Sequence, residues 1–263
     1  MTRNSFDPRS APYRRIFYFR LLRKVARSFY FTIALLPQSL QEPMGLAYLL
    51  ARASDTIADR KLEDFQPVDW ELLEALPQLV DSLNHPSRDQ REAYYIRSVW
   101  EKILQGQQSD LPRTWDLEAL DEYLYLVAGS VGEFWTRMLI HHLPNLMRTS
   151  ASEMINLGIN YGKGLQLVNI LRDRQHDIQQ GRFYYLEEDR TQLYHQAFDY
   201  LKSGKIYLKT LSPGYFKMAT AIPLLLAEET LVLMMSKPHL AMRKVCRFRL
   251  YCTLMKALTL LFF

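Results

Sequence analysis

The amino-acid sequence predicts an all-α protein. Apolar residues recur every three to four positions over most of its 263 residues, which is the period of an amphipathic helix. Alternating apolar and polar runs bounded by Asn-Gly or Asp-Gly turns are missing, so β-hairpins are not expected. Prolines and glycines interrupt the helical pattern at intervals, and each interruption is expected to separate two helices.

The helices can be placed in order along the chain. The first is expected over about residues 14–35, because Pro37 stops it. The second is expected over about 41–58, where Pro43 fits the first turn, and a charged linker at 60–68 follows it. Further helices are expected over about 69–84, 88–106, 116–141, 150–178, 189–211, 214–236 and 238–261. The breaks fall at Pro86, Gly106 to Pro112, Pro144, Gly181, Pro213 and Pro238.

The whole chain, residues 1–263, is expected to form one domain, with a basic N-terminal segment over about residues 1–20. Its composition, 48% hydrophobic and 23% charged, is that of a globular protein and excludes a disordered chain. The two cysteines, Cys246 and Cys252, are too few for a disulfide framework and lack the pairing of a zinc site. This usage favours a reducing compartment.

The net charge of +5 fits nucleic acid, an anionic membrane or a phosphorylated small molecule equally well. The N-terminus lacks the apolar core of a secretory signal, and no uncharged apolar run reaches about 18 residues, so a cytoplasmic protein is expected. The apolar segment 252–263 follows basic residues. It either lies on the inner membrane surface, as a peripheral association, or packs on the core as a last helix.

A first acidic motif, Asp-Thr-Ile-Ala-Asp, falls in the second expected helix. Carboxylates four residues apart share a helix face and repel each other, but a shared Mg²⁺ reverses the sign of that interaction. The residues on this face are Tyr48, Arg52, Asp55 and Asp59. The remainder of the helix is apolar, so the polar stripe is expected to line an internal cavity.

A second acidic motif, Asp-Arg-Gln-His-Asp, repeats this pattern in the expected helix 150–178. The residues on its polar face are Gln166, Asn169, Asp173 and Asp177. A solvated helix face or a buried polar network that fixes packing is the alternative for either motif. Unpaired carboxylates are costly to bury without a cation, however, which favours a metal site.

Acidic stripes in a basic protein predict a phosphorylated substrate that is held through Mg²⁺. Mg²⁺ binds through one or two carboxylates together with phosphate oxygens of the substrate. Arg52, Arg172 and Arg182 are the candidates for direct contact with a diphosphate. Because the walls of the expected cavity are apolar, the part of the substrate beyond its phosphate groups is expected to be apolar too.

These residues resemble the squalene and phytoene synthase family, the head-to-head prenyl synthases. The similar segments, in the order in which the family has them, are Arg27-Ser28-Phe29 with Leu36-Pro37, Tyr48 to Asp59, Tyr123 to Gly132, Gln166 to Arg182, and Ala221-Ile222-Pro223. The resemblance implies a single-domain, isoprenoid-synthase-type helical bundle around a deep apolar cavity. The short chain, without the long apolar anchor of eukaryotic members, is expected to be nearer the bacterial ones.

The resemblance also implies roles for individual residues. Mg²⁺ would be held by Asp55, Asp59, Asp173 and Asp177. Substrate would be bound by Arg27, Ser28, Gln166, Asn169, Arg172 and Arg182, with Arg27 and Ser28 at the second diphosphate. The residues implied in catalysis are Tyr48, Tyr123, Arg52, Asp55 and Asp173, with both tyrosines in the reaction zone. Packing in the core is the alternative for Tyr123.

The implied activity is the condensation of two prenyl diphosphates through presqualene diphosphate. The first acidic helix is closer to squalene synthases than to phytoene synthases, which favours farnesyl diphosphate and squalene or a related C30 product. NADPH would be needed only for squalene. Geranylgeranyl diphosphate with a phytoene product, or a non-catalytic scaffold that binds lipid, are the alternatives. Nucleic acid is supported by charge alone and is not an expected partner, and the oligomeric state is left open.

Two positions depart from the family pattern. His176 stands where many members carry an acid in the second motif, and Ala58 holds the same relative place in the first. Because the four aspartates are present, metal binding is still expected. Gly129 and Gly132 either open space for a prenyl tail or allow close helix packing.

Overall fold

The computed structural model describes residues 11–59, 62–109 and 116–236. Within these ranges the regular structure is helical, and one isolated bridge joins Met147 to Leu211. The first half contains α1 Ala11–Val25, α2 Arg27–Ala34, α3 Gln38–Asp59, η1 Leu62–Asp64, α4 Pro67–Leu83 and α5 Gln90–Ser109. The second half contains α6 Leu117–Leu124, η2 Tyr125–Gly129, α7 Ser130–His142, η3 Pro144–Leu146, α8 Ala151–Gln179, η4 Glu187–Asp189, α9 Arg190–Lys209 and α10 Tyr215–Ser236.

The all-α prediction is confirmed, with two corrections. The expected helix 14–35 is two helices, because Ala26 takes a non-helical backbone conformation between α1 and α2. The expected helix 116–141 is divided by a π-helical turn, η2, between α6 and α7. Helix α5 ends at Ser109, within the break expected at Gly106 to Pro112. The expected helix 238–261, with Cys246 and Cys252, lies outside the described residues.

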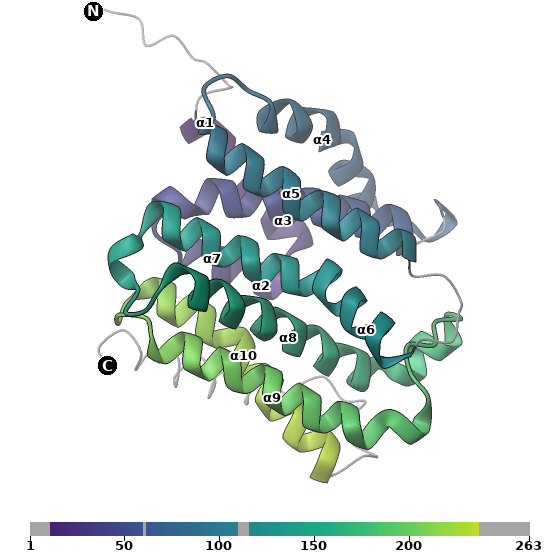
Figure 1. The fold of residues 1–263 in the computed structure, drawn as a ribbon. Helices are drawn as coiled ribbons and strands as arrows, with labels where there is room; N and C mark the ends of the chain where they lie inside the picture. The colour runs from purple at the N-terminus through teal and green to yellow at the C-terminus, as the bar shows by residue number, and fades with distance from the viewer. Residues whose placement is uncertain (1–10, 60–61, 110–115, 237–263) are drawn as a thin grey trace, which may run out of the picture. The chain divides into compact units, whose positions relative to one another are not determined.

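The backbone forms two compact units, residues 1–101 and 102–263, so the expected single domain stays a prediction. In the first unit α1 packs against α2, α3 and α4, and α3 packs against α2 and α4 (Figure 1). Its core is mainly aliphatic, with Leu22, Leu50 and Leu72 fully buried, and it also contains the fully buried Tyr18.

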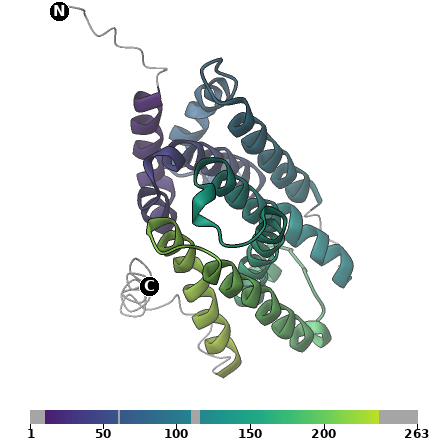
Figure 2. The same ribbon diagram turned by 60° about the vertical axis from the view of Figure 1, so that its left-hand side comes forward.

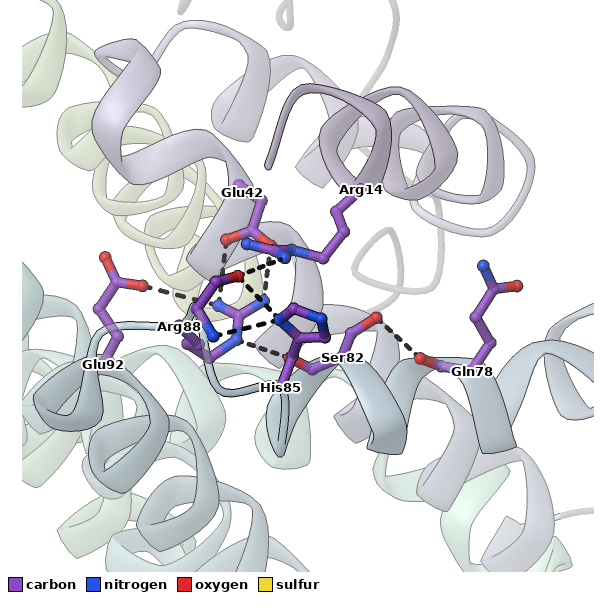
Figure 3. A network of polar contacts seen from close by, with 8 residues as sticks. Arg14, Glu42, Gln78, Ser82, His85, Arg88 and Glu92 are labelled. Atoms are coloured by element: carbon purple, nitrogen blue, oxygen red, sulfur yellow. Dashed lines mark hydrogen bonds and ion pairs between the residues drawn. The ribbon is translucent and has the colours of Figure 1, made fainter. Parts of the chain in front are cut away.

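A buried ion-pair network joins three segments of the first unit (Figure 3). Glu42 on α3 accepts two hydrogen bonds from Arg88, at 3.0 and 2.6 Å, and one from Arg14 on α1, at 2.9 Å. Arg88 also donates to the carbonyl oxygen of Ser82 at 2.8 Å, and lies 3.6 Å from Glu92. The network therefore ties α1 and α3 to the turn between α4 and α5.

In the second unit α8 is the central helix. It packs against α7 and α9, and α10 packs against α8 and α9 (Figures 1 and 2). The core of this unit includes Leu124, Leu167, Leu201 and Leu231. These contacts fix the position of α8, which carries the second acidic motif.

Helices α7 and α8 meet through glycine. A Cβ added at Gly132 on α7 would lie 1.9 Å from the carbonyl oxygen of Gly158 on α8, and one at Gly162 on α8 would lie 2.2 Å from that of Ala128 in the preceding turn η2. Both distances are far below van der Waals contact, so only glycine allows this approach. Close helix packing is therefore the role of Gly132, in place of space for a prenyl tail.

Helix α10 is the one described helix that is long and apolar enough to cross a membrane, with a mean hydropathy of 1.6. Of its apolar window, 56% is buried inside the protein. A core helix of a globular protein has the same length and composition, so this is weak evidence for a membrane span.

Candidate functional site

The first acidic stripe lies on α3 in the first unit. Tyr48, Arg52 and Asp55 are partly exposed, while Leu49 and Leu50 between them are fully buried. This is the division of faces that the spacing predicts. Asp59 is the last residue of α3, and its side chain lies outside the described part of the structure.

Arg52 is anchored by a residue that sequence reasoning missed. Its guanidinium Nη2 lies 3.7 Å from Oδ1 of Asp69, which is 2% exposed. The other oxygen of Asp69 accepts the backbone N–H of Gln66 at 2.9 Å and so caps the start of α4. The signal in the sequence was the Gln-Pro-Val-Asp start of a helix, which is a capping box.

Tyr48 packs against α2. Its ring centroid lies 5.3 Å from that of Phe29, which is exposed, and burial raises the pKa of Tyr48. The phenol therefore stays neutral over the physiological pH range. Arg27 and Ser28 are the first two residues of α2, and their side chains lie outside the described part of the structure.

The second acidic stripe lies on α8 in the second unit. Its members, Gln166, Asn169, Asp173 and Asp177, are all partly exposed. The apolar residues between them face the core, and Leu167 and Val168 are buried. The structure thus brings these four polar side chains onto one face, as the sequence predicts.

Asp173 forms a two-pronged ion pair with the adjacent Arg172. The guanidinium donates to the two carboxylate oxygens at 2.8 and 2.5 Å, and this hydrogen bonding raises the pKa of Arg172. Asp173 is therefore a paired carboxylate, and the argument from the cost of burying an unpaired one does not apply to it. Both side chains are more than a third exposed, so the pair is open to solvent and to a ligand.

Helix α8 ends in a glycine turn that places Arg182 beside the stripe. Gly181 has a φ of +78°, which favours glycine, and the N–H of Arg182 donates to the carbonyl oxygen of Asp177 at 2.8 Å. A small pocket forms here, and Arg174, Asp177, Arg182 and Tyr184 contribute to its lining. The two predicted residues Asp177 and Arg182 therefore share one pocket.

Tyr123 lies on α6, just before the π-helical turn, and is 7% exposed. Its hydroxyl lies 3.3 Å from that of Tyr184, and the two ring centroids are 5.4 Å apart. Sequence reasoning missed Tyr184, although an aromatic run, Phe-Tyr-Tyr, directly follows Gly181 and Arg182 in the sequence.

The side chains of the two stripes suit a hard divalent cation. Asp173 and Asp177 lie one turn apart on α8 and are partly exposed, and Asp55 on α3 is partly exposed too. Carboxylates supply the oxygen ligands that Mg²⁺ prefers, and a partly exposed pair leaves room for phosphate oxygens. The residues present therefore fit Mg²⁺.

Comparison with known proteins gives a consistent result. The squalene/phytoene synthase family matches residues 22–192, a range that contains every predicted site residue. A bifunctional lycopene cyclase/phytoene synthase from Phycomyces blakesleeanus is 30% identical over 71% of this chain and 35% of its own length. The squalene synthase LSS of Botryococcus braunii is 26% identical over 85% of this chain and 58% of its own length.

These relatives are longer than this chain, which spans about a third to three fifths of their length. Among solved structures, TcSQS in complex with the ligand BPH1237 covers 94% of this chain and 89% of its own, with a TM-score of 0.79. At 21% identity this likeness concerns the fold alone.

Proposed function

Because the chain belongs to the squalene/phytoene synthase family, we propose that it condenses two molecules of farnesyl diphosphate head to head, with Mg²⁺, through presqualene diphosphate to squalene or a related C30 product. Head-to-head prenyl condensation is the activity of the family. The choice of farnesyl diphosphate rests on the first acidic helix, Asp-Thr-Ile-Ala-Asp, and on the Ser-Phe and Leu-Pro segments upstream of it.

The observation that carries the proposal is the polar face of α8. Four side chains with oxygen or amide groups lie on one face of a helix whose apolar residues, such as Leu167 and Leu171, pack into the core. Such a face combines ligands for a metal–diphosphate complex with apolar surroundings for a prenyl chain. The α3 stripe repeats this combination in the first unit.

In this mechanism Mg²⁺ would be held by Asp55, Asp59, Asp173 and Asp177. Bound Mg²⁺ would neutralise charge on the diphosphate leaving group. Gln166 and Asn169 donate their amide hydrogens to phosphate oxygens. They occupy the same α8 face as the carboxylates.

The arginines complete the neutralisation of the diphosphate. Arg182 is held at the end of α8 through its backbone hydrogen bond to Asp177. Arg172 is held by its pair with Asp173, and Arg52 by its contact with Asp69. Guanidinium groups that are fixed in this way bind phosphate oxygens at a lower entropic cost than mobile ones.

Loss of diphosphate from the first substrate leaves an allylic cation. The double bond of the second substrate attacks C1 of that cation, and loss of one proton closes the cyclopropane of presqualene diphosphate. Tyr123 belongs to the apolar core of the second unit, where its ring face would stabilise a cation and the surrounding apolar side chains would exclude water. A second ionisation and rearrangement then give the C30 skeleton.

The final step decides the product. Hydride from NADPH would give squalene, proton loss dehydrosqualene, and water hydroxysqualene. A second substrate, geranylgeranyl diphosphate with a phytoene product, is favoured by one observation, the 30% identity to a phytoene synthase-containing relative. The two substrates differ in chain length, so comparing the products formed from each one distinguishes them.

The test is calorimetric titration with unreactive thio analogues of farnesyl diphosphate and of geranylgeranyl diphosphate, each with Mg²⁺ and with EDTA. The proposal predicts binding that requires Mg²⁺ and is lost in Asp173→Asn. The matched control is Asp199→Asn, an exposed aspartate on α9. Binding of equal strength in EDTA contradicts a metal-held diphosphate. Absence of binding for both chain lengths favours a non-catalytic scaffold.

A further inference from the structure

The hydroxyls of Tyr123 and Tyr184 form a buried contact that joins two distant segments of the second unit. They lie 3.3 Å apart, within hydrogen-bond distance, and 61 residues separate them in the sequence. The rings are tilted by 33° with centroids 5.4 Å apart, which is a favourable aromatic geometry. Each residue is 7% exposed, so the contact is shielded from water.

The surroundings of Tyr184 connect this contact to the acidic stripe. Tyr184 follows the glycine turn that ends α8 and lines the same pocket as Asp177 and Arg182. Tyr123 stands on α6 immediately before the π-helical turn. Tyr184 therefore contacts the proposed cation-stabilising ring and also lines the pocket at the proposed diphosphate-binding end of α8.

We propose that Tyr184 is a positioning residue, which holds the Tyr123 ring in the orientation that the second half of the condensation needs. The inference rests on the function proposed above. A ring stabilises a cation only through its face, so its tilt has to be kept within roughly 10–20°. A hydrogen bond to the far end of the phenol restricts that tilt, because the hydroxyl is the atom farthest from the ring's attachment to α6.

The neighbouring tyrosine provides a matched control. Tyr185 is also 7% exposed, but among the described residues its buried hydroxyl has no hydrogen-bond partner. Its ring packs under Arg174, whose guanidinium lies 5.1 Å from the ring centroid. Replacing Tyr185 by Phe thus removes a buried hydroxyl but no hydrogen bond, whereas Tyr184→Phe removes a buried hydroxyl together with its contact to Tyr123.

The experiment compares the wild type with Tyr184→Phe, Tyr123→Phe, the double variant and Tyr185→Phe. Purified proteins are given farnesyl diphosphate and Mg²⁺, with NADPH present and absent, and kcat, KM and the ratio of presqualene diphosphate to final product are measured. We expect Tyr184→Phe to lower kcat by about tenfold with KM within about twofold, since only the oriented transition state is affected. Presqualene diphosphate should accumulate.

The double variant separates positioning from a general structural effect. If Tyr184 acts through Tyr123, the double variant is no slower than Tyr123→Phe alone, because the group to be positioned has already lost its hydroxyl. Tyr185→Phe should match the wild type. Equal effects of Tyr184→Phe and Tyr185→Phe, or single effects that multiply in the double variant, would overturn the inference.

Failure of the inference and failure of the proposed function give different results. A wild type that forms no C30 product from farnesyl diphosphate and no C40 product from geranylgeranyl diphosphate contradicts the function, and with it the positioning role. An active wild type whose kcat and product ratio are unchanged in Tyr184→Phe contradicts the positioning role alone.

Discussion

Arg172 and Asp173 form a two-pronged ion pair within the second acidic motif. The pair is partly exposed, and such pairs contribute about 0–1 kcal/mol to folding. Its value is therefore positional, because Arg172 fixes the direction of the Asp173 carboxylate. Arg52 and Asp69 show the same principle in the first unit, where a buried carboxylate fixes the guanidinium.

We expect Asp173→Asn to lower turnover by more than about a hundredfold, since loss of a metal ligand should exceed the 10–100-fold cost of losing an outer partner. The free energy of unfolding should fall by about 1 kcal/mol or less, because the pair with Arg172 is partly exposed. Steady-state kinetics and urea unfolding measure the two effects. Turnover within tenfold of the wild type would remove Asp173 from the proposed metal site.

At the scale of the helix, Gly132 on α7 and Gly158 on α8 allow the close contact between these two helices. We expect Gly132→Ala to reduce the free energy of unfolding by at least about 2 kcal/mol, because the added methyl meets backbone that cannot move away. Gly129→Ala is the matched control, since its Cβ would lie 3.1–3.3 Å from side-chain carbons that can shift. Equal losses in both variants would contradict the close contact of α7 and α8.

Most helices could be predicted from the sequence because apolar spacing and proline are local signals. Helix caps are local signals as well: at the start of α8 the side chain of Ser150 accepts the N–H of Glu153 at 3.2 Å. The break at Ala26 could not be predicted, since no proline or glycine marks it. Nor could the π-helical turn of η2, which inserts one residue into a helix without changing its composition.

In the candidate site too, local features could be predicted from the sequence and long-range contacts could not. Residues that share a helix face, such as Asp173 and Asp177, could be grouped by spacing alone. The partners Asp69 and Tyr184 could not, because their contacts join segments that are far apart in the sequence. The pairing of Arg172 with Asp173 is local, but adjacent residues on a helix do not normally face each other, so spacing argued against it.

At the scale of the whole molecule, each unit has its own means of holding its helices. The first unit uses the Glu42 network, in which Arg88 is 1% exposed and Glu42 12% exposed (Figure 3). The second unit has apolar packing and glycine contacts around α8, and its ion pairs, such as Lys163 with Asp121 and Lys102 with Glu133, are more exposed than the Glu42 network. Removing a charge from the Glu42 network should therefore lower the free energy of unfolding more than removing a charge from a more exposed ion pair.

We expect Glu42→Gln to lower the free energy of unfolding by about 3 kcal/mol, because two buried guanidinium groups lose their counter-charge. Glu71→Gln is the control, since it breaks an exposed pair with Lys24 and should cost about 1 kcal/mol or less. Thermal and urea unfolding of both variants measure the difference. If the two variants lose equal stability, the network does not hold α1, α3 and the α4–α5 turn together.

The central claim is that this all-α protein joins two prenyl diphosphates head to head. The most direct measurement is mass spectrometry of the products formed from farnesyl diphosphate and Mg²⁺, with and without NADPH. We expect a C30 compound that depends on Mg²⁺: squalene only with NADPH if the reaction is complete, or presqualene diphosphate, an alcohol or a polyene if it ends differently. Geranylgeranyl diphosphate is tested in parallel. A C40 product from it, with no C30 product from farnesyl diphosphate, would identify geranylgeranyl diphosphate as the substrate. No condensed product from either diphosphate would contradict the claim.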